Sequence, residues 1–288
     1  MDILITGLVL GGTYALIAMG LNLQYGMARI MNLANGEMLV AGGFAAFWVY
    51  TAGQVSPLLT VFLVAPVAFV ANWLIYVIFL RPLVKRAKSR GQLEVDSILA
   101  TFGLSFVAVG LMLAVFGGDY FKYSYLARPV TILGDTYGAN RVAAFVAAVI
   151  ICGALYLWLN HSRAGMSIRA IAVAPESARL VGIDVPRLAA LAFALGGAVT
   201  AAGGALISMY LTLDASTGVM FTLKALVIVI MGGVGDVRGT IVAALLLGVL
   251  ETFVATVFDP GLTLAAAYLL FVLILLLRPQ GLFGRRQT

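Results

Sequence analysis

The feature that most constrains this chain is a series of long apolar runs that recurs from one end to the other. Hydrophobic residues make up 62% of its 288 positions and charged residues 10%, whereas soluble domains are about 45–50% apolar. Because a soluble fold of this length cannot bury so much apolar surface, the solvent for most of the chain must be lipid. We therefore expect an all-α, polytopic integral membrane helix bundle, organised as one transmembrane domain over residues 1–288.

A helix that crosses a membrane needs roughly 17–25 apolar residues. The run 222–233 is too short to cross alone, so we expect it to cross with the Gly-rich turn that follows, or to be part of a broken helix. The sequence predicts eight or nine spans, at about residues 3–25, 30–52, 57–80, 95–117, 140–160, 187–210, 222–233, 239–257 and 262–278.

The net charge of +6 is concentrated in segments between the apolar runs. These segments contain Arg81, Lys85, Arg86, Lys88 and Arg90, then Arg163, Arg169, Arg179 and Arg187, and finally Arg278, Arg285 and Arg286. Lys and Arg are retained on the cytoplasmic side of a membrane and so orient the protein. We therefore expect these segments and the C-terminus in the cytoplasm, the N-terminus outside, and no nucleic-acid partner.

Three polar residues interrupt the apolar run Tyr25–Phe44, namely Asn32, Asn35 and Glu37. Polar and ionisable side chains inside a membrane segment are costly and normally face the bundle interior or a water-filled path. We expect all three to line the translocation path. The alternative, which the sequence leaves open, is that they cap and bridge helices without touching a solute.

The segment Phe221–Gly239 ends in a Gly-rich turn that contains Gly232, Gly233 and Gly235. Such a turn can cradle phosphate, but the chain has no G-x-x-x-x-G-K-[ST] pattern, which excludes a nucleotide loop. A glycine-interrupted helix fits better, because irregular backbone at membrane depth survives only where protein buries it or where it lines a cavity. Paired broken segments mark the substrate path in transporters, so we expect this turn and the region 32–43 to line it.

Two opposite charges, Lys224 and Glu251, lie in neighbouring apolar runs. Counting about 1.5 Å per helical residue puts them at similar depths on either side of the Gly-rich turn. Opposite charges at one depth in lipid find each other, so we predict an ion pair. The alternative is that each has a water or backbone partner of its own.

Small residues recur at helical spacing in two of the runs. The two ladders are Gly7, Gly11 and Ala15, and Gly196, Thr200 and Gly204. Small residues let helix backbones approach closely in lipid. We expect both ladders to pack helices within the bundle, the alternative being a subunit interface.

A basic, polar segment of helix-like pattern, Arg163–Pro186, separates two long apolar runs. Pro175 suits the first position of a short helix and Gly182 its C-terminal stop. We expect a helix over 176–181 that presents Ala178 for docking to a soluble motor, since a protein that only conducts needs no such helix; a solvated connector is the alternative. The docking residues expected from this segment are Arg169, Ala172, Pro175, Glu176, Ala178, Arg179 and Gly182.

Four segments together resemble the branched-chain amino acid permease family of ABC importers, LivH type, over residues 3–283. They are Arg169, Ala170 and Ala172 with Ala178 and Gly182-Ile183; Asn32-Leu33-Ala34-Asn35-Gly36-Glu37; the run 221–239; and Arg278-Pro279-x-Gly281-Leu282-Phe283-Gly284. Two positions depart from the family pattern. Asn35 stands where a His is usual, and Ala174 stands where Asp or Asn often precedes Pro175, which removes a side-chain helix cap.

The resemblance implies the translocation subunit of an importer in the bacterial inner (plasma) membrane. Its partners would be two ATP-binding cassette subunits, a second related permease and a periplasmic solute-binding protein. ATP-driven alternating access would carry Leu, Ile or Val inward, or another small solute such as urea or an amide. The chain itself would hold no catalytic residue, metal or cofactor.

Two other classes of protein are alternatives to an importer subunit. The sequence lacks the motifs of an intramembrane enzyme, because it has no H-E-x-x-H, no G-x-S-x-G and no Cys/His cluster. A stand-alone secondary transporter or channel stays open as an alternative. The polar segment Arg163–Pro186 discriminates between a stand-alone carrier and an ABC importer subunit, since a stand-alone carrier has no ATPase to engage.

Overall fold

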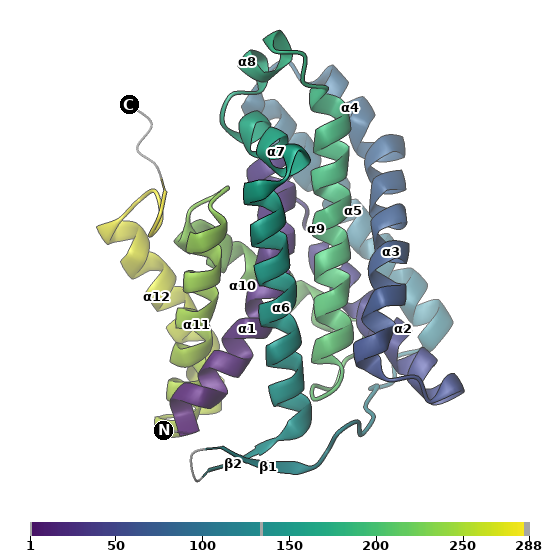
Figure 1. Ribbon diagram of the computed structural model, residues 1–288, viewed down its shortest axis with the longest axis vertical. Helices are drawn as coiled ribbons and strands as arrows, with labels where there is room; N and C mark the ends of the chain where they lie inside the picture. Colours follow the sequence, from purple (N-terminus) through teal and green to yellow (C-terminus); the bar gives the residue numbers. More distant parts are fainter. Residues whose placement is uncertain (1, 133–134, 285–288) are drawn as a thin grey trace.

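The apolar runs fold into helices that pack side by side as an all-α bundle (Figure 1). A computed structural model describes residues 2–132 and 135–284. Arg285 and Arg286, expected on the cytoplasmic side, lie outside the described residues. The bundle helices are α1 (Asp2–Asn22), α2 (Asn35–Gly53), α3 (Pro57–Ile75), α5 (Arg90–Phe116), α6 (Ala139–His161), α9 (Val185–Ile207), α10 (Thr217–Gly232), α11 (Val237–Val257) and α12 (Thr263–Leu277).

Seven helical segments in the described part of the chain are long and apolar enough to cross a membrane, and α10 is a shorter apolar helix. The remaining bundle helix, α2, has 19 residues and carries Glu37 in its first turn. The expected polytopic membrane fold is thus confirmed.

Three of the predicted spans start about five residues from the expected position. The span predicted at 30–52 is helical only from Asn35, because 28–34 is irregular. The span predicted at 95–117 starts earlier, at Arg90, and the span predicted at 222–233 starts earlier, at Thr217. The ends of an apolar run therefore do not by themselves mark where a helix starts.

The predicted loop 81–94 is largely helical. The helix α3 continues through a π-helical turn, η2 (Tyr76–Leu80), into α4 (Arg81–Arg86). Ser89 then caps α5 by accepting a hydrogen bond from the Gln92 amide at 3.2 Å. The basic residues therefore lie on helix ends that extend beyond the apolar runs.

Burial differs greatly among the helices. In the most apolar window of α9, 89% of the residues are buried inside the protein, against 11% for the last span, which contains α12. Small residues set the close packing of α9: a Cβ on Gly204 would lie 1.8 Å from the Leu39 carbonyl oxygen, and one on Gly42 would lie 2.2 Å from the Ala201 carbonyl oxygen. The centre of the bundle is therefore α9 with α1, α2 and α3 around it.

The two ladders of small residues both face other helices of this chain. A Cβ on Gly7 would lie 2.6 Å from Val249 Cα of α11, and one on Gly196 would lie 2.5 Å from the carbonyl oxygen of Gly20 in α1. Such contacts use backbone proximity in place of a hydrophobic driving force. This confirms the expectation that the ladders pack helices within the bundle.

One end of the bundle, which we call the hairpin end, carries the loop between α5 and α6. The loop includes the antiparallel strands β1 (Pro129–Ile132) and β2 (Asp135–Gly138). Phe121 in this loop forms an isolated bridge with Leu213. The hairpin end therefore ties the α5–α6 loop to the segment that follows α9.

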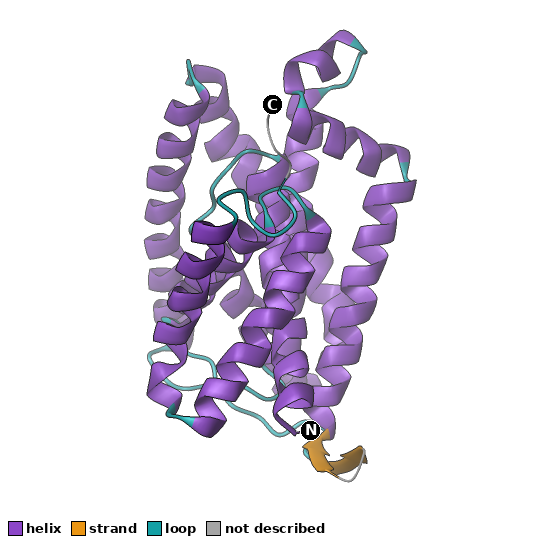
Figure 2. Ribbon diagram, turned by 90° about the vertical axis from the view of Figure 1, so that its left-hand side faces the viewer, coloured by secondary structure: helices purple, strands orange, loops and turns teal. Residues whose placement is uncertain are grey.

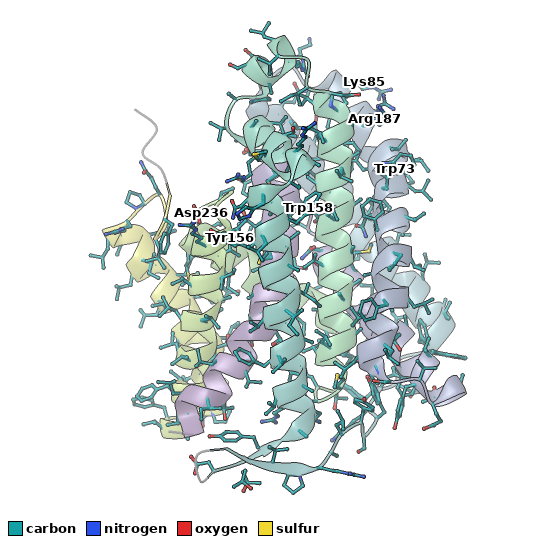
Figure 3. All side chains as sticks on the ribbon, in the orientation of Figure 1. Trp73, Lys85, Tyr156, Trp158, Arg187 and Asp236 are labelled. Atoms are coloured by element: carbon teal, nitrogen blue, oxygen red, sulfur yellow. The ribbon has the colours of Figure 1, made fainter. Side chains whose placement is uncertain are left out.

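The opposite end, which we call the α8 end, carries α7 (Arg163–Val173) and α8 (Pro175–Leu180), and these project from the bundle (Figure 1). Lys85 and Arg187 lie at this end (Figure 3). An excess of Lys and Arg at one end of a helix bundle orients a membrane protein, with that end on the cytoplasmic side.

Candidate translocation site and docking loop

The irregular segment 28–34 lies between the end of the first span and α2, in a bundle that is otherwise mostly helical (Figure 2), and its Ile30, Asn32 and Ala34 are buried. Hydroxyl groups of α5 satisfy its backbone: Ser97 Oγ accepts a hydrogen bond from the Met31 amide at 3.3 Å, and Thr101 Oγ1 accepts one from the Leu33 amide at 3.1 Å. An unpaired backbone group in lipid costs several kcal/mol. These side chains therefore explain how the helix break is tolerated.

The first turns of α2 and α10 meet beside this segment. A Cβ on Gly36 would lie 1.8 Å from the Gly218 carbonyl oxygen, so glycine is required for the contact. Thr222 Oγ1 accepts a hydrogen bond from the Gly36 amide at 2.8 Å, which satisfies one of the free amides at the start of α2. We call 28–34 together with the first turns of α2 and α10 the interior junction.

Asn32 and Asn35 both bind other parts of the protein in the interior junction. Asn35 Oδ1 accepts a hydrogen bond from Thr200 Oγ1 at 3.0 Å, and its Nδ2 donates to the Ile17 carbonyl at 3.4 Å. Asn32 Nδ2 donates to Gln24 Oε1 at 2.9 Å. Both asparagines are buried. In this conformation they bridge helices, and Asn35 makes hydrogen bonds that need no protonated imidazole.

Glu37 is fully buried at the same place. Its Oε1 accepts a hydrogen bond from Ser105 Oγ at 2.9 Å. Its Oε2 has no hydrogen-bond partner among the described residues and lies where a Cβ on Gly218 would come within 2.3 Å. Buried polar atoms are nearly always paired, and intramembrane carboxyl groups mark functional sites. Glu37 therefore makes the interior junction the strongest candidate site in the bundle.

The Gly-rich turn joins α10 to α11 and lies against the end of the first span. Gly233 and Gly235 have φ values of 103° and 85°. The Gly235 amide donates to Asn22 Oδ1 at 2.8 Å, and a Cβ on Gly26 would lie 2.5 Å from Gly235 Cα. The start of α10, rather than this turn, meets the start of α2. That Gly232, Gly233 and Gly235 line the path stays a prediction.

Lys224 and Glu251, the two residues expected to pair, lie in contact. Lys224 Nζ is 2.8 Å from Glu251 Oε2. Tyr14 on α1 donates its hydroxyl to the same oxygen at 2.7 Å and accepts from Lys224 Nζ at 2.7 Å. The charges thus join α1, α10 and α11 in one buried network.

The docking loop, which we define as α7, α8 and the residues up to Asp184, is held by local signals. Ser162 caps α7 by accepting from the Gly165 amide at 2.9 Å. The helix α8 starts at Pro175 and has no side-chain cap at Ala174. It ends at Leu180. Gly182 follows with a φ of 82°, a left-handed conformation that glycine adopts without steric cost. The start at Pro175 and the stop before Gly182 are confirmed, and the helix covers 175–180 where 176–181 was expected.

The end of α8 has two capping hydrogen bonds. The Ile183 amide donates to the Ala178 carbonyl and the Gly182 amide donates to the Arg179 carbonyl, each at 3.1 Å, which is the pattern of a Schellman motif. The expectation that Ala178 is presented for docking is wrong, because it is buried at 4% exposure. Leu180 and Val181 are presented instead, at 89% and 76%.

One side chain connects the docking loop to the interior junction. The Arg29 guanidinium donates a hydrogen bond to the Ala172 carbonyl near the end of α7. Arg29 has a φ of 62°, a rare conformation for a residue with a Cβ. Because Arg29 belongs to 28–34, this hydrogen bond links the end of α7 to the segment that carries Asn32.

Several residues of these regions were not predicted from the sequence. The clearest are Arg29 and the hydroxyl residues Thr101, Ser105, Thr200 and Thr222. Isolated Ser and Thr inside apolar runs are a weak signal, because such residues are common in membrane helices. In the described part of the chain, no group of three His, Cys, Asp or Glu side chains could hold a metal ion.

A helix break buried in a polytopic bundle is typical of membrane transport proteins. Residues 3–277 match the family described as the branched-chain amino acid transport system / permease component. The chain belongs to this family.

The relatives align over nearly the full length. BraD, a high-affinity branched-chain amino acid transport system permease protein of Pseudomonas aeruginosa, is 30% identical and covers 99% of this chain and 96% of its own. LivH of Salmonella typhimurium, described in the same words, is 27% identical, and the match covers 98% of this chain and 94% of LivH. The probable branched-chain amino acid transport permease protein LivH of Methanocaldococcus jannaschii is 25% identical, and the match covers 93% of this chain and 88% of that protein. No solved structure matches the chain significantly.

Proposed function

We propose that this chain is the permease subunit of an ABC importer that carries branched-chain, aliphatic amino acids inward by ATP-driven alternating access. The family and the names of its full-length relatives support this solute class. Within the chain, the contact between Arg29 and Ala172 carries the proposal, because it joins an exposed docking loop to a helix break inside the bundle.

The geometry supports a simple transmission route. An ATPase that binds Leu180 and Val181 pulls on α8 and through it on α7, whose Ile168 and Ile171 are buried in the bundle. The Arg29 side chain passes the movement to 28–34, where irregular backbone yields more easily than a helix. Rearrangement of the interior junction then opens a path on one side and closes it on the other.

The partners follow from the proposed role. Two ATP-binding cassette subunits hydrolyse ATP and engage the docking loops, a second related permease completes the transmembrane pair, and a periplasmic binding protein delivers the solute. The complex lies in the bacterial inner membrane with the α8 end and the C-terminus in the cytoplasm. The cations Lys85 and Arg187 at the α8 end favour this orientation.

The solute is the least constrained part of the proposal. A fructose import permease protein, FrcC of Rhizobium meliloti, is 29% identical, but over only 38% of this chain. The full-length relatives named for branched-chain amino acids therefore weigh more. Urea, amides and other small solutes remain the competing substrates, and uptake competition distinguishes them.

The experiment is uptake of radiolabelled leucine into proteoliposomes that hold the permease with and without its ATPase subunits and binding protein. We expect uptake only in the complete system and only with ATP, and competition by isoleucine and valine but not by urea or acetamide. Uptake by the permease alone would establish a stand-alone carrier or channel instead.

The path itself is tested by cysteine accessibility. Asn35→Cys, in a background where Cys152 is replaced by Ala, should react with a small water-soluble thiol reagent in one nucleotide state, although Asn35 is buried in this conformation. If Asn35→Cys is protected in every nucleotide state, the interior junction does not line the path.

A further inference from the structure

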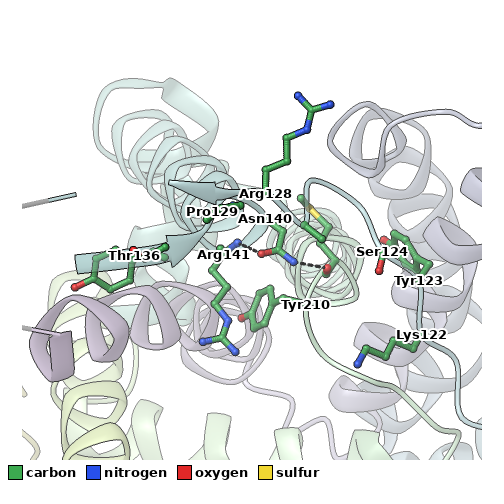
Figure 4. Close-up of a pocket in the computed structure, with 13 residues that line it drawn as sticks. Lys122, Tyr123, Ser124, Arg128, Pro129, Thr136, Asn140, Arg141 and Tyr210 are labelled. Carbon is green, nitrogen blue, oxygen red and sulfur yellow. Dashed lines mark hydrogen bonds between the residues drawn. The ribbon is translucent and has the colours of Figure 1, made fainter. Parts of the chain in front are cut away.

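A cavity of about 540 Å³ opens at the hairpin end (Figure 4). Its walls come from the α5–α6 loop, β2, the start of α6 and the residues that follow α9. Ligand pockets are typically about 300–1,000 Å³, so the cavity has room for a small organic solute.

The charged groups that line this cavity, among the residues the structure describes, are all cationic. They are Lys122, Arg128 and Arg141. None of the three forms an ion pair within residues 2–132 and 135–284. Figure 4 shows Arg141 beside Tyr210, while Arg128 extends away from it and Lys122 lies to another side. Positive charge around a concave site attracts anions and raises their local concentration.

Asp214, an acidic residue near the hairpin end, is hydrogen-bonded to the start of α10. It accepts these hydrogen bonds from Ser216 and Thr217. Burial raises the pKa of Asp214, but these hydrogen bonds together hold it below its ordinary value. The carboxylate therefore stays ionised and bound to the helix start, and it does not neutralise the cavity.

Three uncharged polar side chains of the wall, those of Tyr210, Tyr123 and Asn140, form hydrogen bonds within the protein. Tyr210 donates to Thr13 Oγ1 at 3.0 Å, Tyr123 and Ser208 share a hydrogen bond at 2.9 Å, and Asn140 Nδ2 donates to the Met209 carbonyl at 3.0 Å. Burial raises the pKa of Tyr210 to about 12, so its phenol adds no negative charge. The cations are left to bind a ligand, and the ring of Tyr210 lies under Arg141, 6.0 Å from its Cζ.

The floor of the cavity lies close to the interior junction. Tyr210 contacts Thr13 on α1, and Asn35 contacts Ile17 on the same helix. Thr13 and Ile17 are about one helical turn apart, or roughly 6 Å along α1. One turn of α1 thus links Tyr210 in the cavity wall to Asn35 in the interior junction.

We propose that this cavity binds the carboxylate group of a small aliphatic amino acid before it enters the path, with Arg141 as the main carboxylate ligand. The inference rests on the proposed function. Arg141 can bind a carboxylate in bidentate fashion, and the ring of Tyr210 offers apolar surface to an aliphatic side chain.

The test measures binding to the assembled permease–ATPase complex in nanodiscs, without nucleotide and without the binding protein. Saturation-transfer NMR suits a weak site. The probes are 4-methylpentanoate, which keeps the carboxylate of leucine, and 3-methylbutylamine, which keeps its ammonium. We expect 4-methylpentanoate to bind and to be displaced by L-leucine, and 3-methylbutylamine not to bind.

The variants compare two arginines that each lie over a tyrosine ring. Arg141→Gln should weaken 4-methylpentanoate binding about tenfold, the loss expected for one charge-assisted contact. Arg238→Gln is the matched control, because Arg238 lies 5.4 Å from the Tyr156 ring centroid but does not line the cavity. It should leave binding unchanged, and thermal melts of both variants report on folding.

Equal binding of both probes, or equal affinity of the wild type and Arg141→Gln, would overturn the inference. A separate pull-down measures association with the periplasmic binding protein. If Arg141→Gln weakens that association but leaves 4-methylpentanoate binding unchanged, the cavity is a docking surface and the inference fails. Solute uptake is measured in a third assay. A complex that binds 4-methylpentanoate through Arg141 but imports no aliphatic amino acid would contradict the proposed function and keep the carboxylate site.

Discussion

The buried polar contacts of the bundle and the exposed docking loop are built on opposite principles. The interior junction and the Lys224–Glu251 pair join residues that are far apart in sequence, such as Gly36 and Gly218. Glu37 Oε2 and Glu251 Oε1 are buried there without a hydrogen-bond partner among the described residues. The docking loop is held by local caps at Ser162 and Gly182 and leaves Leu180 almost fully exposed.

This difference separates residues that stabilise the fold from residues that we propose transmit the movement of the ATPase. Removing a contact in the interior leaves a buried polar group without a partner or forces backbones apart, and both are costly in lipid. Replacing Leu180 or Val181 at the tip of the docking loop exposes no buried apolar surface and leaves no buried polar group without a partner, because both side chains are already exposed. We therefore expect interior variants to lose folded protein, and docking-loop variants to lose transport while the fold stays intact.

The largest effect is expected at the ion pair. Lys224→Met or Glu251→Gln leaves the other member of a buried pair without its partner, which costs about 3–5 kcal/mol in comparable pairs. We expect a lower melting temperature and a lower yield of inserted protein for each single variant. The swapped double variant Lys224→Glu with Glu251→Lys should recover part of both, and strict additivity of the single effects would count against a functional pair.

The next largest effect is expected at the helix starts. Gly36→Ala places a methyl group against the Gly218 carbonyl oxygen, and overpacking of this kind costs about 1–3 kcal/mol. Gly103→Ala is the matched control, because nothing lies within 4 Å of its Cβ and alanine favours helix. A thermal melt in detergent should show destabilisation by the first change only. Equal melting temperatures would mean that the two helix starts separate easily.

Arg29 connects the two regions, so its replacement tests the comparison directly. Arg29→Met removes the charge-assisted hydrogen bond to the Ala172 carbonyl, worth about 1.5–3 kcal/mol where such bonds are buried. We expect ATP hydrolysis to continue while solute uptake falls at least tenfold. Normal coupling in Arg29→Met would show that movement reaches the interior by another route.

The smallest effect on stability, within about 0.5 kcal/mol, is expected for Leu180→Asp. The side chain is exposed at 89%, so the fold loses nothing, but a charge at the tip should reduce binding of the ATPase subunits in co-purification. Leu276→Asn is a useful contrast, because this residue of α12 is also highly exposed, at 80%, but lies on another helix. If both variants keep normal ATPase binding, the tip is not the docking surface.

The sequence by itself determined the class of fold and the local form of the docking loop. Apolar runs separated by basic segments leave a helical membrane bundle as the stable solution, since each backbone group must be paired within its own helix. The start of α8 at Pro175 and its stop before Gly182 depend on backbone preferences of single residues. The contact between Lys224 and Glu251 followed from their equal depths.

Where α10 starts, which residue of α8 faces outward and what the polar residues bind depend on the tertiary structure. The helix α10 starts inside the bundle, where Gly218 meets Gly36. Ala178 faces inward because α8 packs against α9, and Asn35 pairs with Thr200. These outcomes depend on contacts between distant residues, and local propensity and periodicity carry no information about which distant helix will lie alongside.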